Sequence, residues 1–454
     1  ETVADLVGVA AGKPAVVVSA GPSLAKNMQL LAQPGVRDRV IIIAVQTVLK
    51  QLLAAGIKPH FVTALDYHEI SARFYEGLTR EDVEGITLVA ECKCNPAIVR
   101  AYPGKIRFVG DDVPDRILGE KLFQNRGRIQ PGSTVAHLAY YLARHMKCDP
   151  VVLVGQDLGF TDGQYYSANA AIHDVWAGEL NEFNTLEMLE WTRIKRMGAH
   201  LRRVPGHDGR SIYTDEQMST YLVQFERDFA KDASAGLRII DATEGGVAKR
   251  HTTIEPLASV VDCQLAARDT TADRAFQEDP TVRHSAEPDV RVGARLREVR
   301  AGVSRVADLS RKAESLMSEM LEHHDDQARV NRLIAKVHAV RRDVEGFDAA
   351  YRLVHFLNQT GAFNRIRSDR NILLDDSLTP KERQRREIER DIENLRQLVA
   401  SAEQLGGILD GATQIAEAPY VKSRRAEKTP ERAVTNGGAR EQRAISVWGV
   451  IALD

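Results

Sequence analysis

The sequence feature that most constrains the fold is a short apolar run, Val16 to Val18, that stops at a Gly21-Pro22-Ser23 turn. A continuous β-branched run is typical of a strand covered on both faces. Gly21 permits a tight turn, and Pro22 and Ser23 are favoured where a helix begins. Such a turn presents backbone N–H groups and the positive end of a helix to an anion. The turn is neither G-x-G-x-x-G nor a P-loop, so on its own it favours an ordinary strand-to-helix connection over a phosphate site.

The alternation of short apolar runs with helical segments continues through about the first 260 residues. Short connections between such strands and helices predict a parallel sheet with helices on both faces. We therefore expect an α/β fold with a Rossmann-like, mostly parallel sheet, followed by a helical C-terminal domain. The expected strands lie at residues 16–18, 39–45, 61–66, 86–90, 106–110, 151–158 and 237–241.

Polar and small residues stand at the ends of these expected strands. Ligands of open parallel sheets bind beyond the carboxyl ends of the strands, so these residues are expected on one edge. A helix that begins after Gly132-Ser133-Thr134 is expected near the same edge. The residues expected there are Gly21, Pro22, Ser23, Gln46, Asp66, Gly132, Ser133, Thr134, Gly155, Gln156 and Asp157.

Length and composition set the broad class of protein. A chain of 454 residues exceeds one compact core of ordinary size, so two or three domains are expected. The composition, with 43% hydrophobic and 27% charged residues, is typical of a soluble globular protein. The formal net charge of −2 favours neither a nucleic-acid binder nor a membrane-surface binder. No apolar run is long enough to span a bilayer.

The cysteine pattern favours reduced thiols and a cytoplasmic location, with a disulfide as the alternative. The Cys92-x-Cys94 spacing is too short for the usual zinc knuckle, so no metal site is expected. The first residue is Glu1 rather than Met, which leaves open a further N-terminal segment. The remaining cysteines are Cys148 and Cys263.

The domain boundaries follow from shifts in composition and periodicity. Residues 1–261 are expected to form the catalytic domain, and the polar stretch 262–300 a linker. Residues 301–417 have amphipathic helical spacing, which predicts a small antiparallel bundle or, as the alternative, a coiled-coil dimerisation arm. The polar tail 418–454 is expected to be disordered. Residues 160–215 have few periodic runs and are expected to form a loop-rich, functional region.

Four short motifs occur in the order and spacing of one known family. They are Gly21-Pro22-Ser23-Leu24, Gly56-Ile57-x-Pro59 followed by Asp66, Gly155-Gln156-Asp157-Leu158, and Ala242-Thr243-Glu244-Gly245-Gly246. The chain thereby resembles the Maf (motility-associated factor) flagellin glycosyltransferases over about residues 14–260. Their central domain is shared with 6-hydroxymethylpterin pyrophosphokinase MptE-like proteins and is similar to the sialyltransferase fold.

The resemblance implies transfer of a nonulosonic, sialic-acid-like sugar from a CMP-activated donor to Ser or Thr of flagellin, with no required cofactor. The donor phosphate would meet the N–H groups of the two turns at residues 21–23 and 132–134. Gln46, Gln156 and Asp66 are the candidates for binding the base and ribose, and Tyr166 and Tyr213 for the leaving phosphate.

The transfer step also needs a carboxylate near the developing sugar cation and a general base for the acceptor hydroxyl. Asp157 and Glu244 are the candidate carboxylates, although each fits an ordinary strand-end or turn residue equally well. His173 is the candidate base, with His207 as the alternative, and either also fits a solvated loop histidine.

Two other functions stay open from the sequence. A pterin pyrophosphokinase would transfer diphosphate from ATP and would need Mg²⁺ held by carboxylates, for which Asp66, Asp157 and Glu244 are candidates. A non-catalytic nucleotide-binding scaffold could use its helical region to dock a protein partner.

Overall fold

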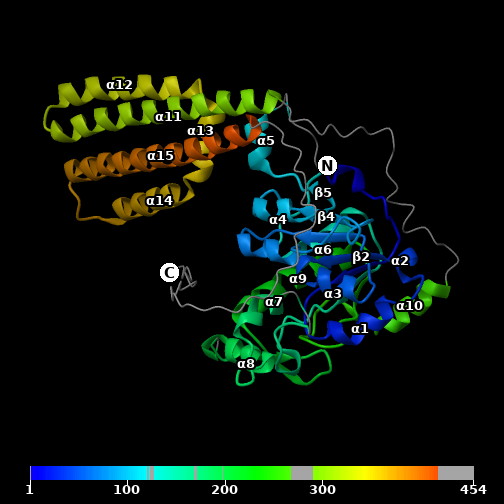
Figure 1. The fold of residues 1–454 in the computed structure, drawn as a ribbon. Helices are drawn as coiled ribbons and strands as arrows, with labels where there is room; N and C mark the ends of the chain where they lie inside the picture. Colours follow the sequence, from blue (N-terminus) through cyan, green and yellow to red (C-terminus); the bar gives the residue numbers. More distant parts are fainter. Residues whose placement is uncertain are drawn as a thin grey trace, which may run out of the picture.

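The computed structural model describes residues 2–119, 122, 127–167, 170, 172–196, 198–266 and 290–417. These residues form a sheet domain and a helical domain, which Figure 1 shows side by side. The predicted tail at 418–454 and most of the predicted linker lie outside the described residues. Both ends of the predicted linker, residues 262–300, are helical. One helix continues to Ala266, and the next begins at Val290.

The sheet domain is built on eight strands, all of them parallel, in the order β10-β9-β6-β1-β2-β3-β4-β5. This confirms the expected fold class. The central strands are buried along their whole length, as continuous apolar runs predict for a sheet covered on both faces. The strands are β1 (Ala15–Val18), β2 (Ile41–Val45), β3 (Phe61–Ala64), β4 (Thr87–Ala90), β5 (Lys105–Phe108), β6 (Val151–Val154), β9 (Ile239–Asp241) and β10 (Thr253–Ile254).

Helices cover both faces of this sheet (Figure 1). Helix α6 packs across β1, β2 and β3, and its Tyr140 ring contacts Phe225 and Phe229 of α9. The helices of this domain are α1 (Leu24–Leu31), α2 (Val36–Arg39), α3 (Leu49–Ala54), α4 (Pro96–Ala101), α5 (Asp112–Leu118), α6 (Val135–His145), α9 (Glu216–Ser234) and α10 (Leu257–Ala266).

The strand order defines one reversal point in the sheet. From β1 the chain proceeds outward through β2 to β5, and it then returns to place β6 on the other side of β1. Ligands of doubly wound sheets bind in the crevice at such a reversal, beyond the carboxyl ends of the strands. The Gly21-Pro22-Ser23 turn follows β1 and the Gly155-Gln156-Asp157 segment follows β6, so both lie at this point.

Residues 160–215 differ from the loop-rich region that the sequence predicts. They include α7 (Ile172–Trp176), α8 (Leu186–Arg196) and an antiparallel hairpin of β7 (Arg202–Pro205) and β8 (Ser211–Thr214). These elements are short, and α8 buries few of its apolar residues. Their sequence periodicity is therefore weak, which is why the sequence did not reveal them.

The helical domain contains α11 (Val290–Glu322), α12 (Gln327–Glu345), α13 (Asp348–Leu357), α14 (Gln359–Leu374) and α15 (Pro380–Glu417). Helices α11 and α15 run antiparallel, as the ion pairs Arg300–Asp410 and Glu314–Arg396 show. The bundle prediction is correct in kind. Helix α12 ends at Glu345, and α13 begins directly after Phe347.

Helix α5 connects the two domains. Ile117 of α5 packs against the apolar core of the helical domain, and its carbonyl accepts a hydrogen bond from Arg295 Nε at 2.9 Å. None of the four cysteines, all of which lie among the described residues, forms a disulfide. Among the described residues, no helix combines the length and the apolar character needed to cross a membrane.

Candidate active site

The turns after β1 and β6 touch through their backbones. The Gly21 N–H donates to the Gly155 carbonyl at 2.7 Å. A Cβ atom on Gly21 would lie 1.9 Å from Asp157 Oδ2, and one on Gly155 would lie 2.4 Å from the Ser19 carbonyl oxygen. Gly155 also has a positive φ of 66°. Only glycine fits both positions, so the close approach of the two turns fixes the shape of the crevice.

Asp157 is a buried carboxylate, only 2% exposed, and its oxygens are engaged by neighbouring groups. Ser23 Oγ donates to Oδ2 at 2.6 Å, the Ser23 N–H donates to the same carboxylate, and Thr161 Oγ1 donates to Oδ1. Burial raises the pKa of Asp157, while the Ser23 and Thr161 hydrogen bonds and the Lys249 charge oppose that rise. Asp157 thus holds the turn after β1 in place.

Ser23 stands where a helix begins, as the sequence predicts, but its side chain does not cap that helix. Helix α1 begins at Leu24, and Ser23 is its N-cap residue without a side-chain capping bond. The hydroxyl instead donates to Asp157, which lies 134 positions further along the chain.

The turn after β9 closes over the same pair of residues. A Cβ atom on Gly245 would lie 2.9 Å from Ser23 Cβ, and the Val247 N–H donates to the Asp157 carbonyl at 2.8 Å. Glu244 has a positive φ of 56°, and its Oε1 accepts the Leu257 N–H at 3.2 Å. The Glu244 carboxylate therefore caps the start of α10, whereas the Asp157 carboxylate binds Ser23 and Thr161, so the two candidate carboxylates have separate partners.

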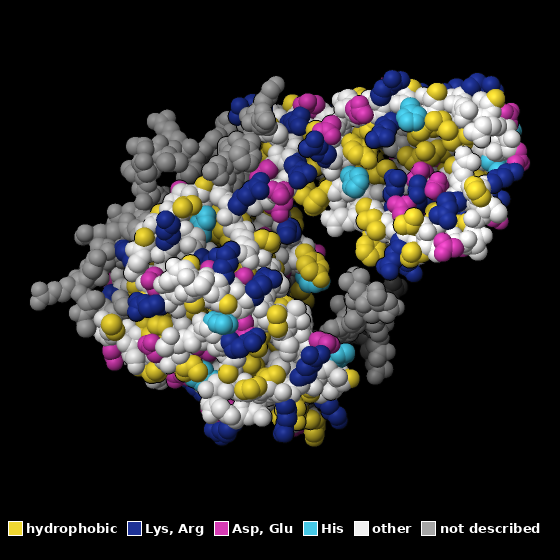
Figure 2. Space-filling view, turned by 180° about the vertical axis from the view of Figure 1, so that it is seen from behind, with side chains coloured by type: hydrophobic (Ala, Val, Ile, Leu, Met, Phe, Trp, Pro, Cys, Tyr) yellow, Lys and Arg dark blue, Asp and Glu magenta, His cyan; other side chains and the backbone are white. Residues whose placement is uncertain are grey.

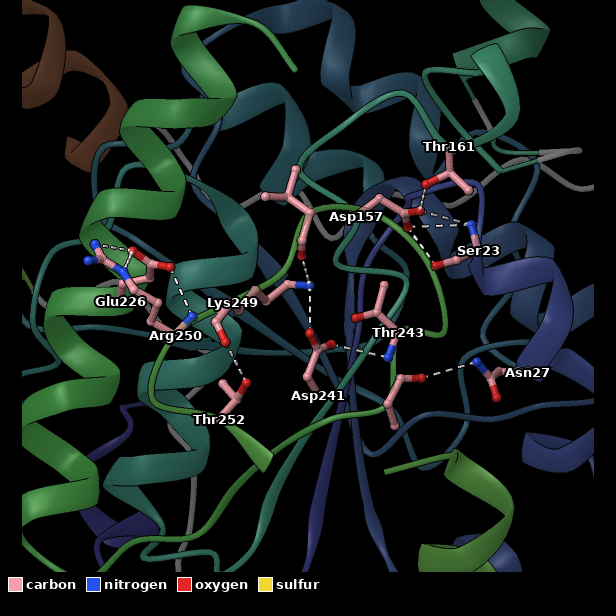
Figure 3. A network of polar contacts seen from close by, with 12 residues as sticks. Ser23, Asn27, Asp157, Thr161, Glu226, Asp241, Thr243, Lys249, Arg250 and Thr252 are labelled. Atoms are coloured by element: carbon pink, nitrogen blue, oxygen red, sulfur yellow. Dashed lines mark hydrogen bonds and ion pairs between the residues drawn. The ribbon is translucent and has the colours of Figure 1, made fainter. Parts of the chain in front are cut away.

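A buried ion pair lies beside this network (Figure 3). Lys249 Nζ lies 3.0 Å from Asp241 Oδ2, and both side chains are fully buried. Lys249 Nζ also donates to the Val247 carbonyl, and the Thr243 N–H donates to Asp241 Oδ1. This pair was not predicted from the sequence. The aspartate at the end of an expected strand was a visible signal, whereas its lysine partner could not be assigned from sequence.

Gln46 and Asp66 meet at the ends of β2 and β3. Gln46 Nε2 donates to Asp66 Oδ2, and the Gln46 Oε1 accepts the Tyr75 hydroxyl at 3.1 Å. Ser71 Oγ also donates to Asp66 Oδ2, at 3.0 Å. Gln46 is fully buried and Asp66 is half-buried. These contacts fix the Asp66 carboxylate at the strand edge, with its Oδ1 receiving no hydrogen bond from the described residues.

The segment after β6 folds back over the turn that follows β1. The Ser167 N–H donates to the Ala20 carbonyl at 2.9 Å, and Ser167 Oγ donates to Gln51 Oε1. This anchor places the half-buried Tyr166 near the strand edge. Burial raises the pKa of Tyr166 to about 12, and the nearby Glu190 and Asp66 carboxylates contribute to the rise. Tyr166 is therefore a neutral hydroxyl near Asp66 at ordinary pH.

His173 forms a buried pair with Glu190 of α8. His173 Nε2 lies 3.0 Å from Glu190 Oε1, and the side chains are only 10% and 4% exposed. Glu190 Oε2 accepts the Tyr165 N–H at 2.8 Å. The other ring nitrogen, His173 Nδ1, is buried and has no hydrogen-bond partner among the described residues. A proton on Nε2, shared with the carboxylate, leaves a lone pair on Nδ1.

The start of α6 is held by its own side chains and by α9. Thr134 is the N-cap, and its Oγ1 accepts the His137 N–H. Ser133 Oγ donates to Gln224 of α9. A Cβ atom on Gly132 would lie 2.4 Å from His137 Cβ. The expected helix start is therefore correct, although both hydroxyls already have partners.

Three other predicted residues lie at different places. Gln156 accepts a hydrogen bond from Ser19 Oγ at 2.6 Å and is buried at the crevice. Tyr213 is 47% exposed on β8 and stacks with Arg203, so no described contact brings it to Asp66. His207 lies between β7 and β8, and its N–H donates to the Gly246 carbonyl.

Two comparisons with known proteins found a match. Residues 1–163 match the family model of 6-hydroxymethylpterin diphosphokinase MptE-like proteins, which confirms the expected MptE-like domain for this part of the chain. The chain is also similar to a solved structure of the Maf glycosyltransferase from Magnetospirillum magneticum AMB-1, at 13% sequence identity and a TM-score of 0.46. That comparison covers 90% of this chain and 57% of the solved one. No curated protein matches the sequence.

Proposed function

We propose that this protein is a glycosyltransferase that moves a nonulosonic sugar from a CMP-activated donor to a Ser or Thr hydroxyl of a protein, with flagellin as the expected acceptor. The observation that carries the proposal is the buried His173–Glu190 pair on the segment that folds over the Gly21–Ser23 turn. In this proposal His173 is the general base, and it lies near the carboxyl ends of the strands, where a nucleotide would bind.

The donor would lie along the carboxyl ends of β1, β2 and β3. The Gly21-Pro22-Ser23 turn, held in place by Asp157, would line the donor site. The expectation that its N–H groups bind the phosphate is wrong, because those of Gly21 and Ser23 already donate to Gly155 and Asp157, and Pro22 has none. The Asp66 carboxylate, oriented by Gln46 and Ser71, would accept ribose hydroxyls. The Tyr166 hydroxyl, neutral at ordinary pH, would donate to the leaving phosphate.

In the transfer step the acceptor hydroxyl oxygen attacks the anomeric carbon of the sugar. The bond from that carbon to the phosphate oxygen breaks, and CMP leaves with the electron pair. His173 Nδ1 takes the hydroxyl proton, and Glu190 stabilises the imidazolium that forms. Nδ1 is buried, so the segment around His173 would have to rearrange before the acceptor hydroxyl reaches it.

The carboxylates do not form the arrangement that a pyrophosphokinase needs. Such an enzyme would use converging carboxylates to hold Mg²⁺ on the diphosphate. Asp66 instead binds Gln46 and Ser71, Asp157 binds Ser23 and Thr161, and Glu244 caps α10. This geometry supports the transferase over the pyrophosphokinase.

The proposal is tested by calorimetric titration of the full chain with CMP, CTP and ATP, each with and without Mg²⁺. We expect micromolar binding of the cytidine nucleotides, about −8 kcal/mol, unchanged by EDTA. Binding of ATP alone, and only with Mg²⁺, would contradict the proposal and favour the pyrophosphokinase. Cytidine binding with no hydrolysis of any CMP-nonulosonic acid would favour a scaffold.

A further inference from the structure

A cavity of about 740 Å³ lies between the sheet domain and the helical domain. It opens at the carboxyl ends of β4 and β5, where Glu91 and Val109 follow the two strands. Phe356 and Leu357, at the end of α13, form its opposite wall. Figure 2 shows the hollow between the domains, with apolar side chains on its helical side. A volume of this size is typical of a ligand site.

The cavity adjoins the edge where the donor would bind. β3 and β4 are neighbours, and the Glu91 N–H donates to the Ala64 carbonyl at the end of β3. The Asp66 carbonyl accepts the Asn95 N–H at 2.8 Å, which ties the two strand ends together. A substrate that extends from Asp66 along the sheet edge therefore enters the cavity.

Glu91 is the buried carboxylate of the cavity, and the Gly132 backbone N–H donates a hydrogen bond to it. It is 9% exposed, and the ion pair that the described residues give it is a 4.0 Å contact with Lys93, whose side chain is 63% exposed. The other acids are engaged, since Asp112 pairs with Arg128 and Asp111 caps α5 through the Val113 N–H. A carboxylate can accept several hydrogen bonds, so Glu91 can bind a further donor or a cation on a ligand.

The helical wall is apolar and exposed. Phe356 is 42% exposed and Leu357 is 37% exposed, although both are large apolar side chains. Helix α14 begins two residues later and exposes Phe363 and Ile366. Exposed apolar side chains on two successive helices, α13 and α14, favour a polypeptide over a small molecule as the ligand.

We propose that this cavity binds the acceptor polypeptide, taking an apolar side chain on Phe356 and Leu357 and a hydrogen-bond donor of the neighbouring Ser or Thr segment on Glu91. The inference rests on the proposed transferase function and gives the helical domain a part in acceptor selection.

Cys92 lines the cavity and provides the readout. The measurement uses the full-length Cys263→Ser variant, which lacks the exposed thiol. Of the three thiols that remain, Cys92 is half-buried. Cys94 and Cys148 are buried, which raises their pKa values to about 11 and about 12, so they form the reactive thiolate less readily. The measurement is the rate at which Ellman's reagent modifies Cys92. The probes are N-acetyl-Leu-Ser-Leu-amide and N-acetyl-Asp-Ser-Asp-amide, chosen because only the first offers apolar groups.

We expect the Leu-Ser-Leu peptide to slow the modification at saturation and the acidic peptide to leave the rate unchanged. Phe356→Ser should weaken protection by the first peptide about tenfold, as loss of a buried anchor does, and Glu91→Gln should weaken it less. The control is Ile254→Ser, an exposed apolar residue on β10 at the opposite edge of the sheet, which should keep full protection.

Equal protection by both peptides, or protection that survives Phe356→Ser, would overturn the inference. Nucleotide titration of the same proteins separates it from the proposed function. Peptide protection without cytidine binding would support the polypeptide site and contradict the proposed CMP-sugar transferase function. Cytidine binding without peptide protection would overturn the cavity assignment alone.

Discussion

Lys249 Nζ lies 3.0 Å from Asp241 Oδ2, and neither side chain reaches solvent. The pair stands at the end of β9, next to the turn that covers Ser23 and Asp157 (Figure 3). Removing two charges from water is costly, so a pair of this kind is stable only while both partners are present.

Lys249→Met should lower the free energy of unfolding by about 3–5 kcal/mol, because it leaves the Asp241 charge buried without compensation. Urea unfolding followed by circular dichroism measures this change. The matched control is the double variant with Asp241→Leu, which removes both charges and should recover much of the loss. A double variant no more stable than Lys249→Met would show that shape, rather than charge, is what this position requires.

Gly21→Ala should abolish nucleotide binding, because the new Cβ would lie 1.9 Å from Asp157 Oδ2 and would force the two turns apart. Calorimetry with CMP measures the loss. Gly407→Ala in α15 is the control, since a Cβ there meets no atom within 4 Å. It should bind CMP normally and gain up to about 1 kcal/mol of stability. Normal CMP affinity in Gly21→Ala would refute the assignment of this turn to the donor site.

Asp157→Asn tests whether this carboxylate positions the turn. We expect the CMP affinity to fall about tenfold, because an amide is a weaker acceptor for the Ser23 N–H and hydroxyl than a carboxylate is. Ser23→Ala should have a similar effect. If Asp157→Asn instead lowered turnover with unchanged CMP affinity, the residue would act in the chemical step.

His173→Asn should lower the rate of sugar transfer about 10²- to 10⁴-fold, as loss of a general base does, and should leave the CMP affinity unchanged. Single-turnover kinetics with a CMP-sugar donor measures the step. Glu190→Gln keeps the size of the partner but removes its charge, so it should also lower the transfer rate while the CMP affinity stays unchanged. A transfer rate equal to that of the unaltered protein would exclude Glu190 as the residue that positions His173.

His137 predicts a pH dependence of stability. Its ring is fully buried against Phe225, and burial lowers its pKa from 6.5 to about 4. The unfolded chain therefore binds this proton more readily than the folded chain does between these pH values. The stability that depends on neutral His137 is complete above pH 6.5 and falls as the pH drops toward 4, by roughly 3 kcal/mol at most.

Urea unfolding at pH 7, 5.5 and 4.5 tests this dependence. A His137→Leu variant keeps an apolar side chain against Phe225 and removes the titrating group, so its stability should fall less over the same range. Parallel curves for the two proteins would show that other groups cause the acid sensitivity.

The strands could be predicted from sequence because a buried parallel strand has a local pattern, and Val16–Val18 and Ile41–Ile43 show it clearly. The turns after β1 and β6 were also recognisable from their glycines. The hairpin of β7 and β8 was missed, since its strands are short and mostly exposed and so have no apolar alternation.

The sequence by itself determined which segments become strands and which polar residues stand at their carboxyl ends, because those properties depend on neighbours a few positions apart. The tertiary structure decided the partners. Ser23 meets Asp157, His173 meets Glu190, and Glu91 faces Phe356 across a cavity. The two residues of each pair lie between 17 and 265 positions apart in the sequence, and only the packing of the sheet and helices brings them together.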